Sequence, residues 1–425
     1  MKVLVLGSGG REHAIAWSFS KSSLLTKLYV APGNAGMAEL ADCINLDIND
    51  FEQISSFCLA NHIDLVMVGP EKPLSNGIVD FLAKHNIKVL GCNSFCSQLE
   101  SSKAFTKKIC DKIGIKTAAY KVFDNLDESL DYLHEQEKFP QVIKADGLAA
   151  GKGVIIAEKR EDAVQAVRDI FSGSYGHMDK VVIEEFLTGV EASFFAISDG
   201  NNFKVLSNAG DYKRVGDNDT GPNTGGMGTY SPSPYVTKRV EEEVVEKILK
   251  VTFNYLKEQG QPYKGIIFAG LMINDRQEPY LIEYNVRFGD PETQSILSRL
   301  KSDFLEICLA AVNGSLAECE VEFSDLKAIT LVLSAKGYPS KYKKGTEIDL
   351  SSVKNIKDIN IFHAGTTIKN NKLVANGGRV LNITALGKSF KHTYDIVYEV
   401  ARKIKWKDKY FRKDIGSVLI NSEES

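Results

Sequence analysis

The sequence carries almost no net charge. Its 52 Lys and Arg residues nearly balance 55 Asp and Glu residues, which gives a formal net charge of −3. Proteins that hold nucleic acid by charge alone present an excess of basic residues. We therefore expect no nucleic acid partner, and any basic site must be local.

Long apolar runs are also missing. No stretch approaches the ~20 apolar residues that a membrane-spanning helix needs. The apolar start, Val3–Leu6, is too short for a signal peptide and is followed at once by glycines and by Arg11, Glu12 and His13. We therefore expect no membrane partner and interpret this start as a first β-strand.

Cysteine is scarce and poorly spaced for cross-linking. The seven cysteines are an odd number and include no Cys-x-x-Cys pair. This pattern does not fit a disulfide framework or a structural zinc site, and it predicts reduced thiols and a cytoplasmic protein.

The composition is otherwise that of a globular protein. The chain is 43% hydrophobic and 25% charged, which excludes a disordered or fibrous protein. Its length of 425 residues predicts about two to four domains.

The first hundred residues alternate short apolar strands with helices. The predicted strands are Lys2–Leu6, Lys27–Ala31, Ile63–Val68 and Lys88–Leu90, and each ends in a loop that contains glycine. This pattern predicts a parallel α/β sheet covered by helices. Because ligands bind at the carboxyl ends of such strands, the loops at 7–12, 32–36 and 69–72 should share one rim.

The first of these loops begins like a dinucleotide fingerprint but does not complete it. Its sixth position is Glu12 where the fingerprint has glycine, and the second strand ends in Pro32-Gly33 with no acidic residue for a ribose. NAD binding is therefore disfavoured. A helix N-terminus with glycine amides can still hold one phosphate; a simple tight turn is the alternative.

A second glycine-rich loop joins two predicted strands, Gln141–Ala145 and Val154–Ala157. It lacks the spacing and the Ser or Thr of a Walker A motif, and it opens no helix. We interpret residues 147–153 as a flexible hairpin that covers phosphates with its backbone amides; an ordinary glycine hairpin is the alternative. The strand at Val181–Phe186 carries Glu184 and Glu185, which suit the ribose or base of a nucleotide.

Residues 207–234 form a long stretch without periodicity that is rich in glycine and in charges of both signs. Such loops in compact domains are usually functional or disordered, and the alternating acids and bases favour function. The helix predicted next, about Lys238–Gln259, has an apolar face and ends at Gly260, so we interpret it as structural.

A possible metal site lies on the strand predicted at Glu278–Val286. Alternation places Glu283, Asn285 and Arg287 on one face. A carboxylate and an amide oxygen suit Mg²⁺, which shares its coordination with substrate phosphates, and the arginine suits a phosphate or a carboxylate. A surface ladder of salt bridges is the alternative.

The last hundred residues contain several short predicted strands and a helix at about Ser389–Lys405, a pattern that predicts a small β-rich domain. The predicted strands are Ala328–Ala335, Glu347–Leu350, Ile361–Lys369, Lys372–Asn376 and Gly378–Leu386. Arg379, which follows two glycines, either closes over the site or lies on the surface.

Together these features indicate ATP with Mg²⁺ held between two sheets. The kinase motifs His-Arg-Asp and Asp-Phe-Gly and a nucleophile elbow are absent from the sequence. A carboxylate activated as an acyl phosphate and then attacked by an amine needs no protein nucleophile. It needs positive charge around the phosphoryl group, alignment and exclusion of water.

Residues 103–295 resemble the ATP-grasp ligases, and nearly the whole chain resembles the phosphoribosylamine–glycine ligase (glycinamide ribonucleotide synthetase) family within them. The segments that carry the resemblance are Gly7–Ala14, Ala31–Gly36, Val68–Glu71, Lys144–Gly153, Asp217–Gly228 and Arg287–Gln294. The resemblance implies a multidomain α/β and α+β fold. It has an N-terminal parallel α/β domain at 1–102, an ATP-grasp core at 103–326 of two α+β subdomains with a mobile lid at about 118–188, and a small β-rich domain at 327–425.

The same resemblance implies a reaction. ATP is cleaved to ADP and phosphate while glycine is joined to 5-phosphoribosylamine through glycyl phosphate, in purine biosynthesis, with Mg²⁺ or Mn²⁺. The residues implied for ATP are Lys103, Lys144, Gly147, Gly151, Gly153, Glu184, Glu185, Leu187 and Glu191. Those implied for the metal are Glu283 and Asn285.

For the substrates, the residues implied for the ribose phosphate are Gly9, Gly10, Arg11, Asn34, Gly36, Pro70 and Glu71. Those implied around glycine and the reacting phosphoryl group are Asp211, Lys213, Arg287, Pro291 and Glu292. Asp211, Lys213 and Arg287 would be catalytic, with Arg287 facing the charge of the transition state.

The sequence departs from the family at a few positions. Tyr212 stands where the family usually has His, and we expect it to change a hydrogen bond near the phosphates. Gly270-Leu271 offers no metal-binding carboxylate on the preceding strand, which leaves the ligands of a second metal open.

Two other interpretations remain. One is a different ATP-grasp enzyme, such as a biotin-dependent carboxylase subunit, and the loop Thr220–Gly228 argues against it. The other is a nucleotide-binding protein without activity, and intact Lys144, Glu283, Asn285 and Arg287 argue against that. We expect a monomer that makes transient contacts with neighbouring purine-pathway enzymes.

Overall fold

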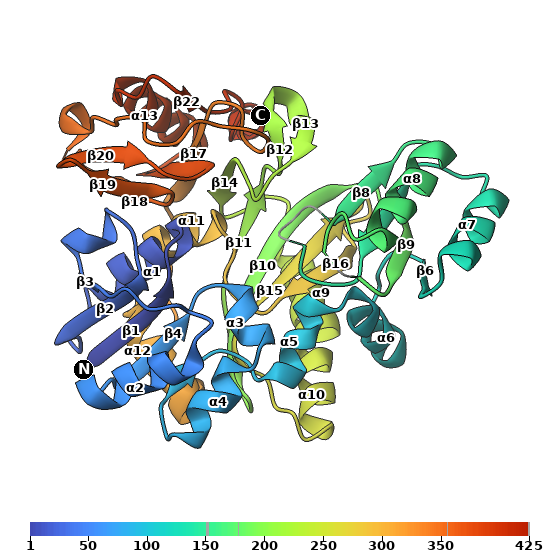
Figure 1. Cartoon of the computed structure of the whole chain (residues 1–425), viewed down its shortest axis with the longest axis horizontal. Coiled ribbons are helices and arrows are strands. Elements are labelled where there is room, and N and C mark those ends of the chain that lie inside the picture. Colours follow the sequence, from blue (N-terminus) through green and yellow to red (C-terminus); the bar gives the residue numbers. More distant parts are fainter. Residues whose placement is uncertain (150–152, 177, 355, 424–425) are drawn as a thin grey trace.

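The computed structural model describes residues 1–149, 153–176, 178–354 and 356–423. The N-terminal part contains a five-stranded sheet in the order β3-β2-β1-β4-β5, in which all four neighbouring pairs are parallel (Figure 1). Its strands are β1 Lys2–Gly7, β2 Lys27–Pro32, β3 Asp42–Cys43, β4 Leu65–Val68 and β5 Val89–Leu90. Its helices are α1 Gly10–Phe19, α2 Phe51–Asn61, α3 Glu71–Ser75, α4 Ile78–Lys84 and α5 Ser94–Ser101, with a 3-10 turn η1 at Met37–Glu39. The predicted parallel sheet is confirmed.

The loops that follow β1, β2 and β4 meet at one edge of this sheet. The amide of Gly33 donates to the Gly7 oxygen (3.2 Å), and the amide of Gly69 donates to the Leu6 oxygen (3.0 Å). The side-chain amide of Asn34 reaches the Ser8 oxygen at 2.9 Å. The predicted shared rim is therefore confirmed.

A second, antiparallel sheet forms a separate lobe at the right of Figure 1, in the order β6-β9-β7-β8. Its elements are β6 Tyr120–Phe123, α7 Leu126–Glu135, β7 Gln141–Ala145, β8 Val154–Ala157, α8 Arg160–Phe171 and β9 Val181–Glu185. Leu133, Val167 and Ile170 of the helices pack on Ile143 and Ile183 of the strands, which gives this lobe its own apolar core. We call it the lid lobe.

A nine-stranded sheet forms the centre of the molecule. Its main path is β16-β15-β10-β11-β14-β17-β21-β18, and β22 pairs with β17. The strands are β10 Val190–Asp199, β11 Phe203–Asp211, β14 Gly228–Ser231, β15 Lys264–Ile273, β16 Pro279–Asn285, β17 Lys327–Ala335, β18 Ile359–His363, β21 Arg379–Gly387 and β22 Lys409–Tyr410. Because β14 pairs with β17, the C-terminal strands extend the sheet of the core.

Helices cover this sheet on both sides, and small hairpins stand at its edges. The helices are α6 Lys103–Ile113, α9 Lys238–Val244, the π-helical turn η3 Val245–Leu249, α10 Lys250–Glu258, α11 Glu292–Arg299, α12 Phe304–Asn313, α13 Phe390–Lys403 and α14 Ser417–Glu423. The hairpin strands are β12 Arg214–Gly216 with β13 Thr220–Asn223 and β19 Thr366–Lys369 with β20 Lys372–Ala375, and the 3-10 turns are η2 Asp217–Asp219, η4 Leu316–Glu318 and η5 Ser351–Val353.

Four predicted elements differ from the structure. The stretch 207–234, expected to be a loop, contains the end of β11, the hairpin β12–β13 and the strand β14. The strand predicted at Ile361–Lys369 is two strands, β18 and β19, which belong to different sheets. The helix predicted at about 238–259 is a continuous series of α9, η3 and α10, so its π-helical middle was missed. The strand predicted at Glu347–Leu350 is wrong: Glu347 and Asp349 make only isolated bridges, to Val374 and Lys405. Short polar segments of this kind take their conformation from their neighbours.

Helix α11 explains how the three parts meet. Each of its eight residues is buried, although six are polar or charged. Ser295 exchanges hydrogen bonds with Thr229 (2.9 Å) and Thr330 (2.7 Å), and Arg299 donates to the hydroxyl of Ser231 at 2.9 Å. The helix thus places its first residue, Glu292, deep between the N-terminal sheet and the nine-stranded sheet.

Across the described residues, no helix has the length and apolar character that crossing a bilayer requires.

Candidate active site

The ATP residues predicted on the lid lobe include a buried group of charges. Lys144 on β7 lies 2.8 Å from Oε2 of Glu184 on the neighbouring strand β9, and both side chains are almost fully buried. Lys107 of α6 lies 3.3 Å from the same oxygen. The other oxygen of Glu184 is buried and has no hydrogen-bond partner among the described residues, so it can accept a bond from a ligand.

The base of the glycine-rich hairpin contacts the start of α6. Lys103 donates to the Gly147 oxygen at 3.1 Å, and Asp146 accepts from the Ala104 amide at 3.1 Å. The Gly153 oxygen accepts from the Ala145 amide at 2.8 Å, which closes the hairpin between β7 and β8. The predicted connection of two antiparallel strands is confirmed, whereas Gly151 lies outside the described residues.

The other predicted ATP residues lie where the chain passes from the lid lobe to the central sheet. Glu185 accepts a hydrogen bond from the Ala119 amide at 2.9 Å and returns one from its own amide to the Ala119 oxygen. Leu187 is half-buried. The exposed carboxylate of Glu191 lies 2.8 Å from Nζ of Lys213.

The predicted metal ligands occupy the end of β16. Burial alone would raise the pKa of Glu283, but Lys213, Lys144, Lys103 and Arg287 together hold it below its usual value, so this carboxylate is ionised at neutral pH. Oδ1 of Asn285 accepts one hydrogen bond from Arg287 at 3.1 Å. Two hard oxygen donors on one strand fit Mg²⁺ or Mn²⁺.

Glu283 and Asn285 alone provide too few ligands to hold a cation. Among the described residues, no group of three or more His, Cys, Asp or Glu side chains could hold a metal ion. Mg²⁺ sites commonly combine one or two carboxylates with substrate phosphates and water. The site therefore fits a cation that arrives with a nucleotide.

Two of the residues predicted around glycine, Asp211 and Lys213, line a small cavity next to this pair. Asp211 at the end of β11, Lys213 and Glu283 line one small cavity together with Glu191 and Ser193. Burial raises the pKa of Asp211, and the nearby carboxylate of Glu292 raises it further. Oδ1 of Asp211 is buried without a partner among the described residues.

Arg287 is held more tightly than the sequence suggested. Its guanidinium donates to Glu100 at 2.7 Å, to Glu71 at 3.1 Å and to Asn285 at 3.1 Å. Two carboxylates thus pair with its single positive charge, and one of them, Glu71, is a residue predicted for the ribose phosphate. Glu100 was missed because it lies within a helix of ordinary composition.

The predicted phosphate loops of the N-terminal part are bound to each other and to distant segments. The Gly9 amide donates to Oε2 of Glu12 at 2.7 Å, so this amide is already occupied. Arg11 donates to the Phe288 oxygen at 3.0 Å. The Asn34 side chain donates to the His363 oxygen at 2.8 Å and accepts from the Gly36 amide at 3.0 Å.

The remaining predicted loop residues fit tightly into this rim. A Cβ added at Gly36 would lie 2.5 Å from the His13 ring, and one at Gly10 would overlap Asn382 of the C-terminal part. Pro70 precedes α3, of which Glu71 is the first residue. Pro291 precedes α11 and accepts a hydrogen bond from Thr229 at 3.3 Å.

Arg379 belongs to the site region and is not a plain surface residue. It donates to the main-chain oxygens of Gly225 and Asp290, both at 2.5 Å. It therefore joins the loop before β14 to the turn before α11.

Tyr212 packs against the C-terminal segment. Its hydroxyl accepts a hydrogen bond from the Gly416 amide at 3.0 Å, and its ring centre lies 4.8 Å from the Arg412 guanidinium. Tyr212 also packs in the apolar core of the C-terminal part. The neighbouring C-terminal segment thus takes up the Tyr212 hydroxyl, and the expected change of a hydrogen bond near the phosphates stays a prediction.

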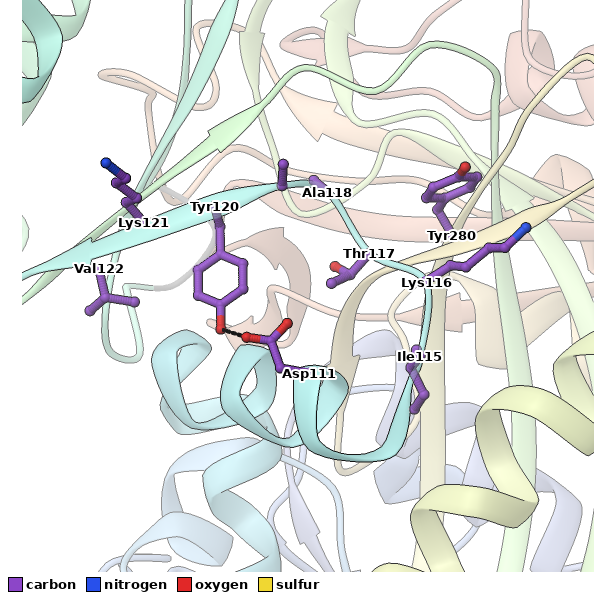
Figure 2. A pocket seen from close by; sticks show the side chains of 10 residues that line it. Asp111, Ile115, Lys116, Thr117, Ala118, Tyr120, Lys121, Val122 and Tyr280 are labelled. Atoms are coloured by element: carbon purple, nitrogen blue, oxygen red, sulfur yellow. Dashed lines mark hydrogen bonds between the residues drawn. The ribbon is translucent and has the colours of Figure 1, made fainter.

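A larger hollow lies beside residues 114–119, which connect α6 to β6 and which we call the hinge segment. This groove of about 580 Å³ is lined by the segment 115–122 with Asp111 and Tyr280. Figure 2 shows the hydrogen bond from the Tyr120 hydroxyl to Asp111. It also shows Lys116 beside Tyr280. None of the predicted ATP residues lines it.

Models of the phosphoribosylglycinamide synthetase family match three consecutive segments of the chain. The N domain matches residues 1–100, the ATP-grasp (A) domain 101–293 and the C domain 328–418. The chain belongs to this family.

Relatives in the family match over the full length. The chain is 48% identical over 426 residues to the phosphoribosylamine–glycine ligase of Mesorhizobium japonicum, with 100% of both chains covered. It is 45% identical to the enzyme of the same name from Caldanaerobacter subterraneus, covering 98% of this chain and 100% of the other.

Solved structures agree with this assignment. The crystal structure of phosphoribosylamine–glycine ligase from Thermotoga maritima superposes with a TM-score of 0.84 at 35% identity and covers 98% of this chain and 100% of the other. A biotin carboxylase domain from Hydrogenobacter thermophilus, described in complex with MgADP, has a TM-score of 0.74 at 16% identity and covers 96% and 91%. The second likeness shows the ATP-grasp fold alone.

Proposed function

We propose that this member of the phosphoribosylglycinamide synthetase family performs its chemistry in the crevice between the lid lobe and the end of β16. The chain is an ATP-dependent carbon–nitrogen ligase that joins 5-phosphoribosylamine and glycine, with ADP and phosphate as the other products. This reaction gives glycinamide ribonucleotide in purine biosynthesis. The single observation that carries it is the family match over N, A and C domains together with full-length relatives at 45–48% identity.

ATP would lie against Lys103, Lys144 and Glu184. Oε1 of Glu184, which is buried and has no partner among the described residues, could accept a hydrogen bond from the adenine base. Lys144 supplies positive charge for a phosphate. Gly147 and Gly153, at the two ends of the glycine-rich hairpin, would cover the phosphates, and Glu185, Leu187 and Glu191 would border the base and ribose. This arrangement excludes water from the reacting phosphoryl group.

The enzyme uses Mg²⁺ or Mn²⁺ with ATP, as its family does. Glu283 and Asn285 would hold the cation. A bound cation neutralises developing phosphate charge. Lys213, which lies near Glu283, would add positive charge on the same side.

Glycine would bind beside Lys213 and Glu283, where the cavity of about 10 Å³ has to widen to admit it. Its carboxylate, once phosphorylated, becomes an acyl phosphate that the amine of phosphoribosylamine attacks, with phosphate as the leaving group. Asp211 and Glu292 are close and both have raised pKa values, with burial as the first cause. One of them can therefore be protonated at neutral pH. The other can accept a proton from the substrate amine.

Arg287 would act through its neighbours as well as through its own charge. Because Glu71 and Glu100 both pair with the guanidinium, its clearest contribution is to fix Asn285 and Glu71. The ribose phosphate would bind at the rim formed by Gly9–Arg11, Asn34–Gly36 and Pro70. Residues 1–102 would then bind the phosphoribosylamine, residues 103–326 would carry out the ATP chemistry, and residues 327–425 would cover the rim.

The chain acts on small molecules, and we propose that it does so as a cytoplasmic monomer. The seven cysteines are free, which suits a reducing compartment. Because phosphoribosylamine is short-lived, transient contact with the enzyme that supplies it would favour transfer.

The test is ADP release measured with ATP and glycine, then after addition of phosphoribosylamine. We expect sustained release only when all three are present, and formation of glycinamide ribonucleotide in equal amount. Bicarbonate in place of glycine tests the carboxylase alternative. Release that depends on bicarbonate, or none with the three substrates, would exclude the proposed function.

A further inference from the structure

Lys107 is a buried cation that connects three parts of the ATP-grasp core. It lies one helical turn after Lys103, on the buried side of α6, and only 2% of it is exposed. Its ammonium donates to the hydroxyl of Thr117 at 2.6 Å and to the Ala118 oxygen at 3.2 Å. Figure 2 shows Thr117 and Ala118 on the segment that leads from α6 into the lid lobe.

The third contact of Lys107 is with the lid lobe itself. Its Nζ lies 3.3 Å from Oε2 of Glu184, the oxygen that Lys144 approaches to 2.8 Å. One carboxylate is therefore shared by two ammonium groups, and all three side chains are at most 4% exposed. A helix, a hinge segment and a lid strand meet at one cation.

The charges of this group do not cancel. Two lysines and one glutamate leave one positive charge in excess, whereas Lys144 and Glu184 alone would be neutral. Burial lowers the pKa of Lys107, while Glu184 raises it and Lys144 lowers it. An unpaired ammonium at this depth would be costly, and the contacts with Glu184, Thr117 and Ala118 compensate for that burial.

We propose that Lys107 is a positioning residue for the triphosphate: it balances Glu184 and thereby leaves the charge of Lys144 available to a phosphate. It also fixes the hinge segment relative to α6 and β9. Lys107 touches no predicted ligand position, so its effect passes through Glu184 and Lys144. The inference rests on the proposed placement of ATP beside these two residues.

The consequence is measurable as nucleotide affinity. Replacing Lys107 by Met keeps the length of the side chain but removes its charge. We expect Lys107→Met to weaken ATP binding, measured as Kd by calorimetry and as KM, by about tenfold, which corresponds to ~1.4 kcal/mol. The KM for glycine should not change. Lys108→Met, on the exposed side of the same helix, is the matched control and should bind ATP as the parent does.

A charge-balancing variant separates this role from a merely structural one. The reference is Glu184→Gln alone, because Glu184 is itself a proposed ATP contact. Without the Glu184 charge, Lys107 has nothing to balance, so adding Lys107→Met to Glu184→Gln should weaken ATP binding by less than about threefold. A further loss of about tenfold in the double variant, or a Lys107→Met protein with unchanged ATP affinity, would overturn the proposal. Lys107→Arg keeps the charge and provides a folded variant for the same comparison if Lys107→Met does not fold; weak ATP binding by folded Lys107→Arg would also overturn it.

Lys144→Met, measured in parallel, distinguishes a failure of the proposed ATP site from a failure of the proposed role of Lys107. If Lys144→Met binds ATP normally, ATP does not lie beside Lys144 and the proposed function is misplaced. If Lys144→Met weakens ATP binding and Lys107→Met does not, the ATP site stands and the role of Lys107 is refuted.

Discussion

Arg379 donates a hydrogen bond to the main-chain oxygen of Asp290, which lies 89 residues earlier in the chain. The same guanidinium nitrogen binds the oxygen of Gly225. One residue at the start of β21 in the C-terminal part therefore ties together the loop that precedes β14 and the turn that leads into Pro291 and Glu292. The C-terminal part contributes to the geometry of the site without supplying a predicted catalytic residue.

Removal of this tie should impair turnover more than folding. We expect Arg379→Met to lower kcat/KM for glycine by about 10- to 100-fold, because small displacements of aligned groups have effects of that size. Arg379→Lys should recover only part, since a lysine cannot reach both oxygens in the same way. The measurement is steady-state kinetics, with the exposed Arg402→Met as control. Parent activity in Arg379→Met would contradict the role.

Glu283→Gln tests the cation site. The change removes the negative charge of the Glu283 carboxylate. Burial raises the pKa of this carboxyl group, but four neighbouring cations lower it below its usual value, so the group is ionised in the parent. We expect kcat to fall by at least about 100-fold while cooperative unfolding is retained. The matched control is Glu278→Gln, a half-buried partner of Lys116 just before the same strand. Parent turnover with saturating Mg²⁺ would remove the metal assignment.

Tyr212→Phe tests whether this residue is structural. The hydroxyl accepts from the Gly416 amide, and its loss should lower the free energy of unfolding by about 1 kcal/mol. Because the ring packs against the C-terminal segment, kcat should not change. Urea unfolding and steady-state kinetics give the two readouts. A large fall in kcat with unchanged stability would place Tyr212 in the chemistry.

His13 and His363 should make the folded protein sensitive to acid. Burial lowers their pKa values to about 3 and about 4, and Nδ1 of His13 accepts a hydrogen bond from the His363 amide at 2.8 Å. Between the ordinary value of 6.5 and these lowered values, the unfolded chain binds protons that the folded chain does not. Stability from this pair is therefore present above pH 6.5 and is lost as the pH falls toward 4.

The acid sensitivity can be assigned by substitution. We expect the free energy of unfolding of His363→Gln to depend less steeply on pH between 4 and 6.5, by up to about 1.4 kcal/mol per pH unit. The exposed His392→Gln should keep the parent slope. Equal slopes in all three proteins would mean that His363 does not control this range.

Features that depend on neighbouring residues could be predicted from the sequence. Short apolar strands followed by Gly7, Gly33 and Gly69 predicted the parallel sheet and its shared rim, because alternation and turn chemistry act over a few residues. Lys144 and Gly153 predicted two antiparallel strands joined by a hairpin for the same reason. Glu283 and Asn285 were recognisable because a strand puts alternate residues on one face.

Partners far apart in the chain were decided by the tertiary structure. Lys107 differs little from Lys108 in sequence, and only the packing of α6 against the hinge buries one and exposes the other. Arg287 meets Glu100 across 187 residues and Glu71 across 216, and Tyr212 meets Gly416 across 204. Local patterns set the strands and loops because their free energies come from adjacent residues, whereas burial and charge pairing depend on which distant surfaces the fold brings together.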